Sequence, residues 1–467
     1  MKTQAIGDLA RWVGQSVELQ GWVMARRSSK DLVFLVMRDG SGLCQCVADR
    51  STLGDAMYDE AEALTQESAF YCRGEVVADP RQIGGHEVRL SEIRTLHLSK
   101  DFPITPKEHG VDFLMDHRHL WLRSKRQWAI MRIRNTLIMA IHRFFQDRGF
   151  VQMDAPIFTD NACEGTSTLF ATDFYGHPAY LSQSGQLYGE AMAMAMGKIY
   201  TFGPTFRAEK SKTRRHLSEF WMIEPEMAFC DLRQNMDLIE EFLRDVVSAV
   251  LERNRLELEL IERPIEPLQK VTQPFVRIPY EEAVQIIRGE RLVNGQSALD
   301  VLRDDLAQVR RSIEETRTEI SEREAKLAQP GLKKGEIGHH QAQLQAARQR
   351  LDTAEEQERN LPQWIASASS FEAGNDFGGS DETVLTRLFE TPIMVYNWPH
   401  EVKAFYMKRD ENDPRWAKGV DVLASRKASS SAHLRRWTGV TTSGRRWTPN
   451  ASIIARRTAG GVKGASA

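Results

Sequence analysis

Two apolar segments joined by a short basic loop constrain the fold of this chain more than any other feature. The first segment runs from Tyr200 to Phe206 and the second ends at Trp221, while the loop between Lys210 and Arg215 is polar. Aromatic and β-branched residues on both sides of a short polar loop are typical of two antiparallel strands. The sequence therefore predicts a strand hairpin in this region.

This hairpin carries residue types that suit a nucleotide. A guanidinium such as that of Arg207 fits phosphate oxygens, the carboxylate of Glu209 can accept a hydrogen bond from an adenine amino group, and the ring of Phe220 offers a stacking face. An isolated arginine and glutamate on paired strands are more often an ordinary cross-strand ion pair. The neighbouring residues decide between the two interpretations.

The string Phe206-Arg-Ala-Glu209, Arg215-His-Leu217 and Glu219-Phe-Trp221 resembles motif 2 of the class II aminoacyl-tRNA synthetases, in the form found in asparaginyl-tRNA synthetases. The resemblance implies an ATP site. In it, Arg207 would be the catalytic residue that holds the α-phosphate. The expected ATP-binding residues are Arg207, Glu209, Arg215, His216, Leu217 and Phe220.

Length, charge and cysteine content agree with this resemblance. A chain of 467 residues is long for one core and suggests two or three domains. The net charge is −2, so any contact with nucleic acid must come from local basic patches. The five cysteines form no C-x-x-C pair, which argues against a zinc site. No apolar run approaches the ~20 residues that span a bilayer. We expect a reduced, cytoplasmic protein with no membrane segment.

Short alternating segments dominate residues 1–100. The expected strands are Val17–Val23, Leu32–Met37, Leu43–Val47, Ala69–Val77 and Glu87–Leu96, with a helix near residues 51–65. Five strands and one helix fit an OB-fold, a barrel that often binds single-stranded nucleic acid, although they also fit other small β-barrels.

Three residues of this segment are candidates for contact with an RNA base. The string through Gly21-Trp-Val, Arg27, Phe34, Arg38-Asp-Gly40 and Gln45 resembles the anticodon-binding domain of the aspartyl, asparaginyl and lysyl synthetases. The resemblance implies that Phe34 stacks on the middle anticodon base of tRNA(Asn), that Gln45 hydrogen-bonds the edge of that base, and that Arg27 holds base or phosphate. A ring and an amide suit an unstacked loop base. The strand pattern alone would place Phe34 in the core.

Residues 101–123 form a linker punctuated by Pro103 and Pro106. The first part of the core, residues 124–298, begins with an amphipathic helix that ends at Gly149. Its apolar residues are Ile130, Ile133, Leu137, Ile141, Phe144 and Phe145. The continuation through Pro156 resembles motif 1 of the same family, which implies a homodimer interface. Periodicity alone indicates only a buried helix.

Further segments resemble the amino-acid pocket of these synthetases. The resemblance implies that Glu164 meets the α-ammonium group of asparagine and that Ser182 and Gln186 form the pocket floor. A glutamate after motif 2 would face the side-chain amide; Glu224 aligns best and Glu226 is the alternative. A carboxylate accepts from an amide NH2 but repels the carboxylate of aspartate, so it would select asparagine.

Between residues 299 and 361 the pattern changes to that of an inserted helical hairpin. Leucine, isoleucine and valine recur at three- and four-residue spacing, and Pro330 and Gly331 interrupt the pattern once. A solvated spacer is the simpler interpretation, and an arm that touches tRNA or a partner is the alternative. The core resumes over residues 362–423. There, Asp421 resembles the aspartate that helps to hold the Mg²⁺ ions of ATP.

The tail, residues 424–467, has an aberrant composition. Residues 422–467 contain no Asp or Glu, although the chain has 64 in 467. The resemblance to the family stops here, and the magnesium-binding glutamate, a substrate arginine and motif 3 are missing. Codons for residues 425–429, read one base out of frame, can encode Pro-Glu-Gly-Phe, close to the expected continuation. A frameshift is our preferred interpretation and a basic RNA-binding tail is the alternative. We expect no regular strand or helix in this tail.

Together these features predict an α+β protein with an OB-fold barrel, a class II catalytic domain built on an antiparallel sheet, and an inserted helical hairpin. By resemblance, the chain would activate asparagine with ATP and transfer it to tRNA(Asn), with activity impaired by the loss of motif 3. Two other interpretations remain: an aspartate-using enzyme of the same fold, and a non-catalytic RNA-binding remnant.

Overall fold

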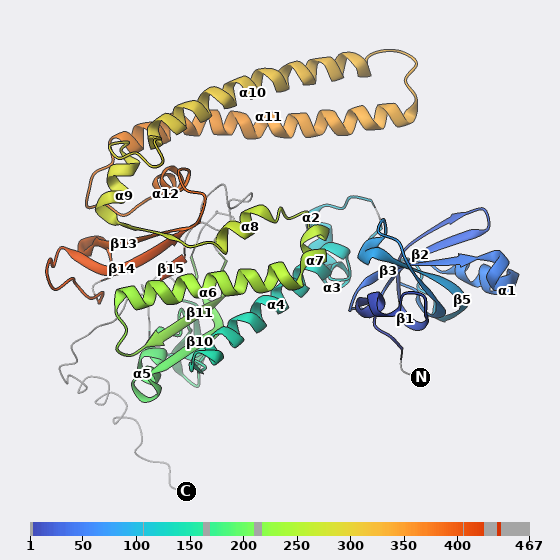
Figure 1. The fold of residues 1–467 in the computed structure, drawn as a ribbon, viewed down its shortest axis with the longest axis horizontal. Coiled ribbons are helices and arrows are strands. Elements are labelled where there is room, and N and C mark those ends of the chain that lie inside the picture. Colours follow the sequence, from blue (N-terminus) through green and yellow to red (C-terminus); the bar gives the residue numbers. More distant parts are fainter. Residues whose placement is uncertain are drawn as a thin grey trace, which may run out of the picture. The chain divides into compact units, whose positions relative to one another are not determined.

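The computed structural model describes residues 3–105, 107–161, 169–209, 217–404, 406–424 and, for the backbone, 437–439. The chain divides into two compact units (Figure 1). The first comprises residues 1–134 and 254–263, and the second comprises residues 135–253 and 264–467. The first unit is larger than the expected domain of residues 1–100, because the linker, the start of the following helix and a short later segment pack with the barrel.

The first unit is built on a closed five-stranded barrel with strand order β1-β2-β3-β5-β4, which confirms the predicted OB-fold. Its elements are η1 (Ile6–Trp12), β1 (Ser16–Ser29), β2 (Leu32–Arg38), β3 (Leu43–Asp49), α1 (Arg50–Ala63), β4 (Ala69–Ala78), η2 (Ile83–Gly85), β5 (His86–His97), α2 (Val111–Asp116), α3 (Arg118–Trp121) and α7 (Arg255–Leu260). Alternate residues of each strand point inward. Val33, Leu35 and Met37 of β2 are accordingly fully buried in the barrel core.

A buried ion pair ties the linker to the barrel. The guanidinium of Arg38 donates to both carboxylate oxygens of Glu67, at 3.0 Å each, and also to the backbone carbonyl of Arg123 at 2.6 Å. The Arg123 guanidinium reaches the same carboxylate at 3.2 Å. Because two arginines share one glutamate, this cluster keeps a net positive charge, carried toward the surface by the partly exposed Arg123.

The second unit holds three small sheets. Their strand orders are β11-β10-β6, β12-β13-β14-β15 and β7-β9-β8. The strands are β6 (Val151–Gln152), β7 (Phe158–Thr159), β8 (Ala171–Phe174), β9 (His177–Leu181), β10 (Lys198–Phe206), β11 (Glu219–Met227), β12 (Val276–Pro279), β13 (Ile393–Pro399), β14 (Trp416–Leu423) and β15 (Trp437–Gly439). The helices are α4 (Lys125–Asp147, which begins in the first unit), α5 (Gln186–Met196), α6 (Leu232–Arg253), α8 (Glu266–Val271), α9 (Tyr280–Ile287), α10 (Ala298–Leu327), α11 (Lys334–Ser369), α12 (Gly379–Thr386) and the short η4 (His400–Val402).

The predicted amphipathic helix is α4, and it ends where the sequence indicates. Gly149 follows it at φ +75°, a left-handed conformation that glycine adopts without a steric penalty. The amide of Phe150 then donates to the carbonyl of Phe145 at 3.0 Å, which closes the helix end. Phe144 and Phe145 are almost fully buried. The ring of Phe145 stacks on that of Tyr200, with centroids 4.7 Å apart, so the helix packs against β10.

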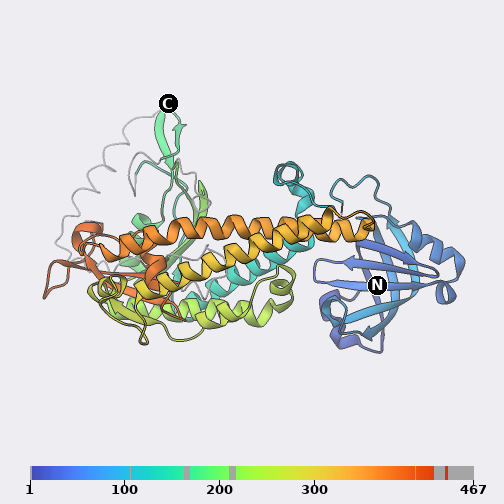
Figure 2. The same ribbon diagram turned by 90° about the horizontal axis from the view of Figure 1, so that it is seen from above.

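The predicted helical hairpin is formed by α10 and α11, which run side by side in opposite directions (Figure 1 and Figure 2). At its base, Leu302 and Leu361 are buried in the same core cluster as β13. Along its length, ion pairs join the helices at Arg310–Glu358, Arg317–Glu355, Arg348–Glu324 and Arg350–Glu319. Exposed pairs of this kind add little stability, and they mark which residues of one helix lie opposite residues of the other.

The expectation that the tail forms no strand is wrong. Residues 437–439 form β15, which pairs antiparallel with Val420–Val422 of β14. Part of the β14 edge is therefore covered. Backbone pairing explains the difference, because an open strand edge can recruit a short segment whatever its side-chain pattern.

Within the described residues, no helix has the length and apolarity required to cross a membrane.

Candidate amino-acid and nucleotide site

The predicted hairpin is present as β10 and β11, and its register places the candidate residues. Thr201 pairs with Glu224, and Thr205 pairs with Phe220. Directly paired residues have their side chains on the same face of the sheet. Thr201 and Glu224 therefore lie together, and α5 packs against these two strands.

Glu224 lies at the centre of a buried hydrogen-bond network. One carboxylate oxygen, Oε2, accepts from the backbone amide of Gly185 at 2.8 Å and from the hydroxyl of Thr201 at 3.2 Å. The other, Oε1, accepts from the hydroxyl of Ser184. A carboxylate offers about four acceptor positions, so these three donors leave roughly one for a ligand.

Gly185 is required by this arrangement. A Cβ atom at residue 185 would lie 2.6 Å from the Thr201 hydroxyl and 3.0 Å from Oε2 of Glu224. Contacts of that length do not occur without displacement, so any other residue would push apart the groups that hold the carboxylate.

A cavity of about 220 Å³ opens beside Glu224. It is lined by Met153, Asp154, Ala155, Pro156, Ile157, Ser182, Gly185, Thr201, Phe202, Gly203, Pro204, Thr205, Trp221 and Glu224. Two of the predicted pocket residues, Ser182 and Glu224, are thus brought together. Gln186 does not line the cavity, and its amide donates to Oε1 of Glu190 at 3.2 Å.

The alternative selector, Glu226, is in a different environment. Burial raises its pKa to about 8, and the nearby carboxylates of Glu190 and Glu224 add to the rise. A carboxyl group with that pKa is largely protonated at neutral pH, so it cannot repel a ligand carboxylate strongly. Glu224 lines the cavity and Glu226 does not, which favours Glu224 as the residue that faces a ligand.

The nucleotide candidates lie at the loop end of the hairpin, next to its last paired residues. The guanidinium carbon of Arg207 is 5.5 Å from the centre of the Phe220 ring, so the predicted phosphate and stacking groups are neighbours. The backbone amide of Arg207 donates to the carbonyl of Ser218 at 3.0 Å. Glu209 and Leu217 are exposed. Glu164, Arg215 and His216 lie outside the described residues.

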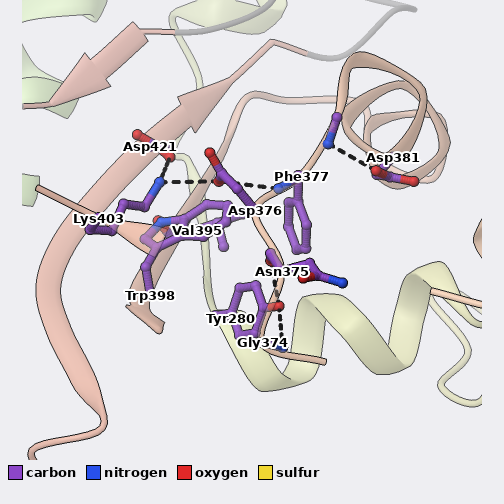
Figure 3. Close-up of polar contacts among 11 residues, drawn as sticks. Tyr280, Gly374, Asn375, Asp376, Phe377, Asp381, Val395, Trp398, Lys403 and Asp421 are labelled. Carbon is purple, nitrogen blue, oxygen red and sulfur yellow. Dashed lines mark hydrogen bonds and ion pairs between the residues drawn. The ribbon is translucent and has the colours of Figure 1, made fainter. Parts of the chain in front are cut away.

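Asp421 has a protein partner of opposite charge (Figure 3). Its Oδ2 lies 3.0 Å from Nζ of Lys403, and the same ammonium group is 3.2 Å from Oδ1 of Asp376 and 3.8 Å above the Trp398 ring. Across the described part of the chain, no three His, Cys, Asp or Glu side chains gather in a group that could hold a metal ion. The carboxylate that the resemblance assigns to Mg²⁺ is therefore paired with a lysine in this structure.

The three anticodon candidates lie on the outer face of the barrel. Phe34 is half-buried and does not belong to the barrel core, contrary to what its strand pattern alone indicates. The Arg27 guanidinium lies 4.5 Å from the centre of its ring. The Gln45 amide donates to Glu87 at 3.2 Å. The structure thus brings Arg27 and Phe34 together. Gln45 lies on β3, opposite Val36 of β2.

Ser184 and Thr201 were not among the predicted site residues, although both hold Glu224. The predicted hairpin could have pointed to Thr201, because the pairing of its two strands determines which residue lies opposite Glu224. That pairing depends on the loop length, and a one-residue slip would place a different residue there.

Comparison with known proteins decides the family. The model for "tRNA synthetases class II (D, K and N)" matches residues 110–441, and that for "OB-fold nucleic acid binding domain" matches residues 17–96. The chain belongs to the class II aminoacyl-tRNA synthetases of the D, K and N group. This assignment confirms the fold class predicted from the sequence.

Individual members of this synthetase group are similar over most of the chain. An asparagine--tRNA ligase of Sorangium cellulosum is 48% identical over 421 residues, which cover 90% of this chain and 80% of that protein. The corresponding ligase of Koribacter versatilis is 42% identical over 422 residues, 90% of this chain and 79% of that protein. The asparaginyl-tRNA synthetase of Pyrococcus horikoshii, solved with asparaginyl-adenylate, has a TM-score of 0.67 and 30% identity, covering 91% of this chain and 81% of that chain.

Proposed function

We propose that this chain is an asparagine--tRNA ligase of the cytoplasm, which uses ATP to activate asparagine and then transfers it to tRNA(Asn). The observation that carries the proposal is the cavity beside Glu224, because its carboxylate has about one acceptor position left for the amide NH2 of asparagine. The similarity to asparagine--tRNA ligases over 90% of the chain supports the same substrate.

The chemistry would take place between the cavity and the Arg207–Phe220 pair. The carboxylate of asparagine attacks the α-phosphorus of ATP, and pyrophosphate leaves. A ribose hydroxyl of tRNA then attacks the carbonyl carbon of the resulting adenylate, which forms the aminoacyl ester and releases AMP. Arg207 would bind the α-phosphate as negative charge develops, and Phe220 would stack on the adenine. The protein would contribute mainly alignment and charge neutralisation. No step is assigned to Mg²⁺.

The test of this proposal uses a tail-exchanged protein, in which residues 424–467 are replaced by the corresponding residues of the Sorangium cellulosum ligase. We expect this protein to exchange pyrophosphate into ATP when asparagine is added, and much less when aspartate is added. Exchange driven better by aspartate would identify an aspartate-using enzyme. Binding of tRNA with no exchange would identify an RNA-binding remnant.

Replacing Phe34 by alanine is expected to weaken tRNA binding without affecting adenylate formation. Loss of a stacking ring costs roughly 1–3 kcal/mol, which is about one to two decades in affinity. Filter binding of labelled tRNA(Asn) to the unaltered chain and to the variant measures the effect. Since Phe34 lies outside the barrel core, the fold should persist. An unchanged affinity would exclude Phe34 as an anticodon contact.

Glu224→Gln in the tail-exchanged protein is expected to relax the rejection of aspartate, because the repelling charge is removed while the side-chain shape is kept. The measurement is the ratio of asparagine- to aspartate-dependent pyrophosphate exchange, which should fall by about tenfold or more. Glu226→Gln is the matched control. Since Glu226 is largely protonated at neutral pH, its replacement should leave the ratio almost unchanged. The reverse outcome would make Glu226 the selector.

We further propose that the enzyme is a homodimer joined through α4 and the segment after it. Met139 of α4 and Ile157 and Phe158 of the following segment are exposed. The exposed ring of Phe174, from β8, lies 6.2 Å from that of Phe158, and Tyr175 lies beside Phe174. Soluble monomers rarely leave several such residues uncovered in one region. Sedimentation equilibrium of the purified chain measures the oligomeric state directly.

A further inference from the structure

A second cavity lies in the first unit, and the proposed chemistry does not use it. Its volume is about 480 Å³, within the range of small-molecule pockets. It is lined by Trp22, Arg38, Glu67, His97, Ser99 and Arg123. These residues come from the barrel strands β1, β2 and β5, from the turn before β4 and from the linker.

The lining combines a positive charge with an aromatic face. Arg38 and Arg123 share the carboxylate of Glu67, so the three groups together carry one net positive charge. The Arg123 side chain is 46% exposed and Trp22 is 44% exposed. His97 is exposed beside them. A cation and an indole face together suit a ligand with a phosphate and a flat ring, which is the chemistry of a nucleotide.

The cavity continues the surface that carries the anticodon candidates. Arg27 pairs with Phe34, and Trp22 pairs with Arg38, on the same two strands. Phe34 and Arg38 are four residues apart on β2, so both point outward, roughly 13 Å apart at ~3.3 Å per residue. A single RNA strand that crosses the Phe34 ring can therefore reach Trp22 along one face of the barrel.

We propose that this cavity binds a further nucleotide of the same tRNA strand whose base stacks on Phe34. The base lies against Trp22, and the phosphate lies between Arg123 and His97. Arg38 and Glu67 form the wall that holds the Arg123 backbone in place, through the hydrogen bond from Arg38 to its carbonyl. This proposal rests on the proposed function, because it takes the bound RNA to be tRNA.

The first experiment removes the stacking face. Trp22→Ala in the unaltered chain should weaken binding of labelled tRNA(Asn) about tenfold in a filter-binding titration, whereas Trp22→Phe should retain most of the affinity. Val13→Ala is the matched control. Val13 is 44% exposed, like Trp22, but it precedes β1, forms an isolated β-bridge with Val76 and does not line the cavity. Circular dichroism verifies that each variant is folded.

The second experiment removes the charge. Arg123→Gln should weaken binding and reduce the slope of log affinity against log salt by about 0.7, the value for one phosphate contact on a single strand. Arg11→Gln, at a 79% exposed arginine of the same unit, should leave the slope unchanged. His97→Gln provides a second variant at an exposed position, and it should weaken binding in the same direction.

The outcomes separate the two proposals. If Phe34→Ala weakens tRNA binding while Trp22→Ala, Arg123→Gln and His97→Gln do not, the cavity is not an RNA site and the proposed function stands. If the unaltered chain binds no tRNA, both proposals are overturned. Weaker binding of tRNA by the cavity variants, with the two controls unaffected, supports the additional nucleotide site.

Discussion

The tail-exchanged protein is expected to exchange pyrophosphate into ATP at least about 10²–10³-fold faster than the chain with its own tail. Removal of one transition-state donor commonly costs that much in rate. By resemblance to the family, the tail should carry a glutamate, a substrate arginine and the motif 3 arginine, and residues 422–467 contain no acidic residue at all. Arg207 and Phe220 are neighbours in the structure, so the replacement adds groups to a site that already holds these two.

Two controls make this comparison decisive. Arg207→Gln in the tail-exchanged protein should return exchange to near background, which shows that the gain uses the motif 2 site. Light scattering of both proteins should show more aggregation for the original chain, although β15 already covers part of the β14 edge. Equal turnover by the two proteins would refute both the frameshift interpretation and the expected role of motif 3.

The second large effect is expected from Lys403→Met, which should lower the free energy of unfolding by about 3–5 kcal/mol. Removing one partner of a buried ion pair leaves the other charge uncompensated. Here the side chains of Lys403 and Asp421 are only 8% and 6% exposed, and Asp376 shares the same ammonium group. Two carboxylates would face each other without the cation between them (Figure 3).

Urea denaturation followed by tryptophan fluorescence measures this loss, and the Trp398 ring lies directly under the ammonium group. Lys408→Met is the matched control, because Lys408 is more exposed and pairs only near the surface with Glu411, so it should cost less than about 1 kcal/mol. Combining Lys403→Met with Asp421→Asn should recover part of the stability. A loss no larger than that of the control would show that the pair is not important for the fold.

Short-range sequence patterns predicted most of the architecture. The barrel strands, α4 with its end at Gly149, and the β10–β11 hairpin each depend on alternation, helical spacing or a turn signal within a few residues. The helical hairpin was also predicted, but α11 runs to Ser369, beyond the expected end at residue 361. The last turns of α11 still place apolar residues at helical spacing toward the core, as at Leu361, Ile365 and Ala368. The helical spacing therefore does not show where the inserted hairpin ends and the core resumes.

The contacts that hold the site residues in place could not be predicted from local sequence patterns. Glu224 was predicted from resemblance, but its donors Ser184 and Thr201 depend on strand register and on the turn before α5. The pairing of Asp421 with Lys403 joins β14 to a loop 18 residues earlier, and no local pattern indicates it. The β15 strand was missed because backbone groups, rather than side-chain pattern, produce its pairing.

The two arms of the α10–α11 hairpin start from neighbouring points of the core, so the length of the hairpin can change during evolution without altering the core. Leu302 and Leu361 are buried in the same cluster, so the chain leaves the core and returns to it at neighbouring points. Between them, ion pairs such as Arg317–Glu355 and Arg348–Glu324 match residues of one arm to residues of the other. Insertions or deletions that change both arms equally keep these matches and leave the base unaltered. Length variation among related genes should therefore concentrate here, in matched pairs of helical turns.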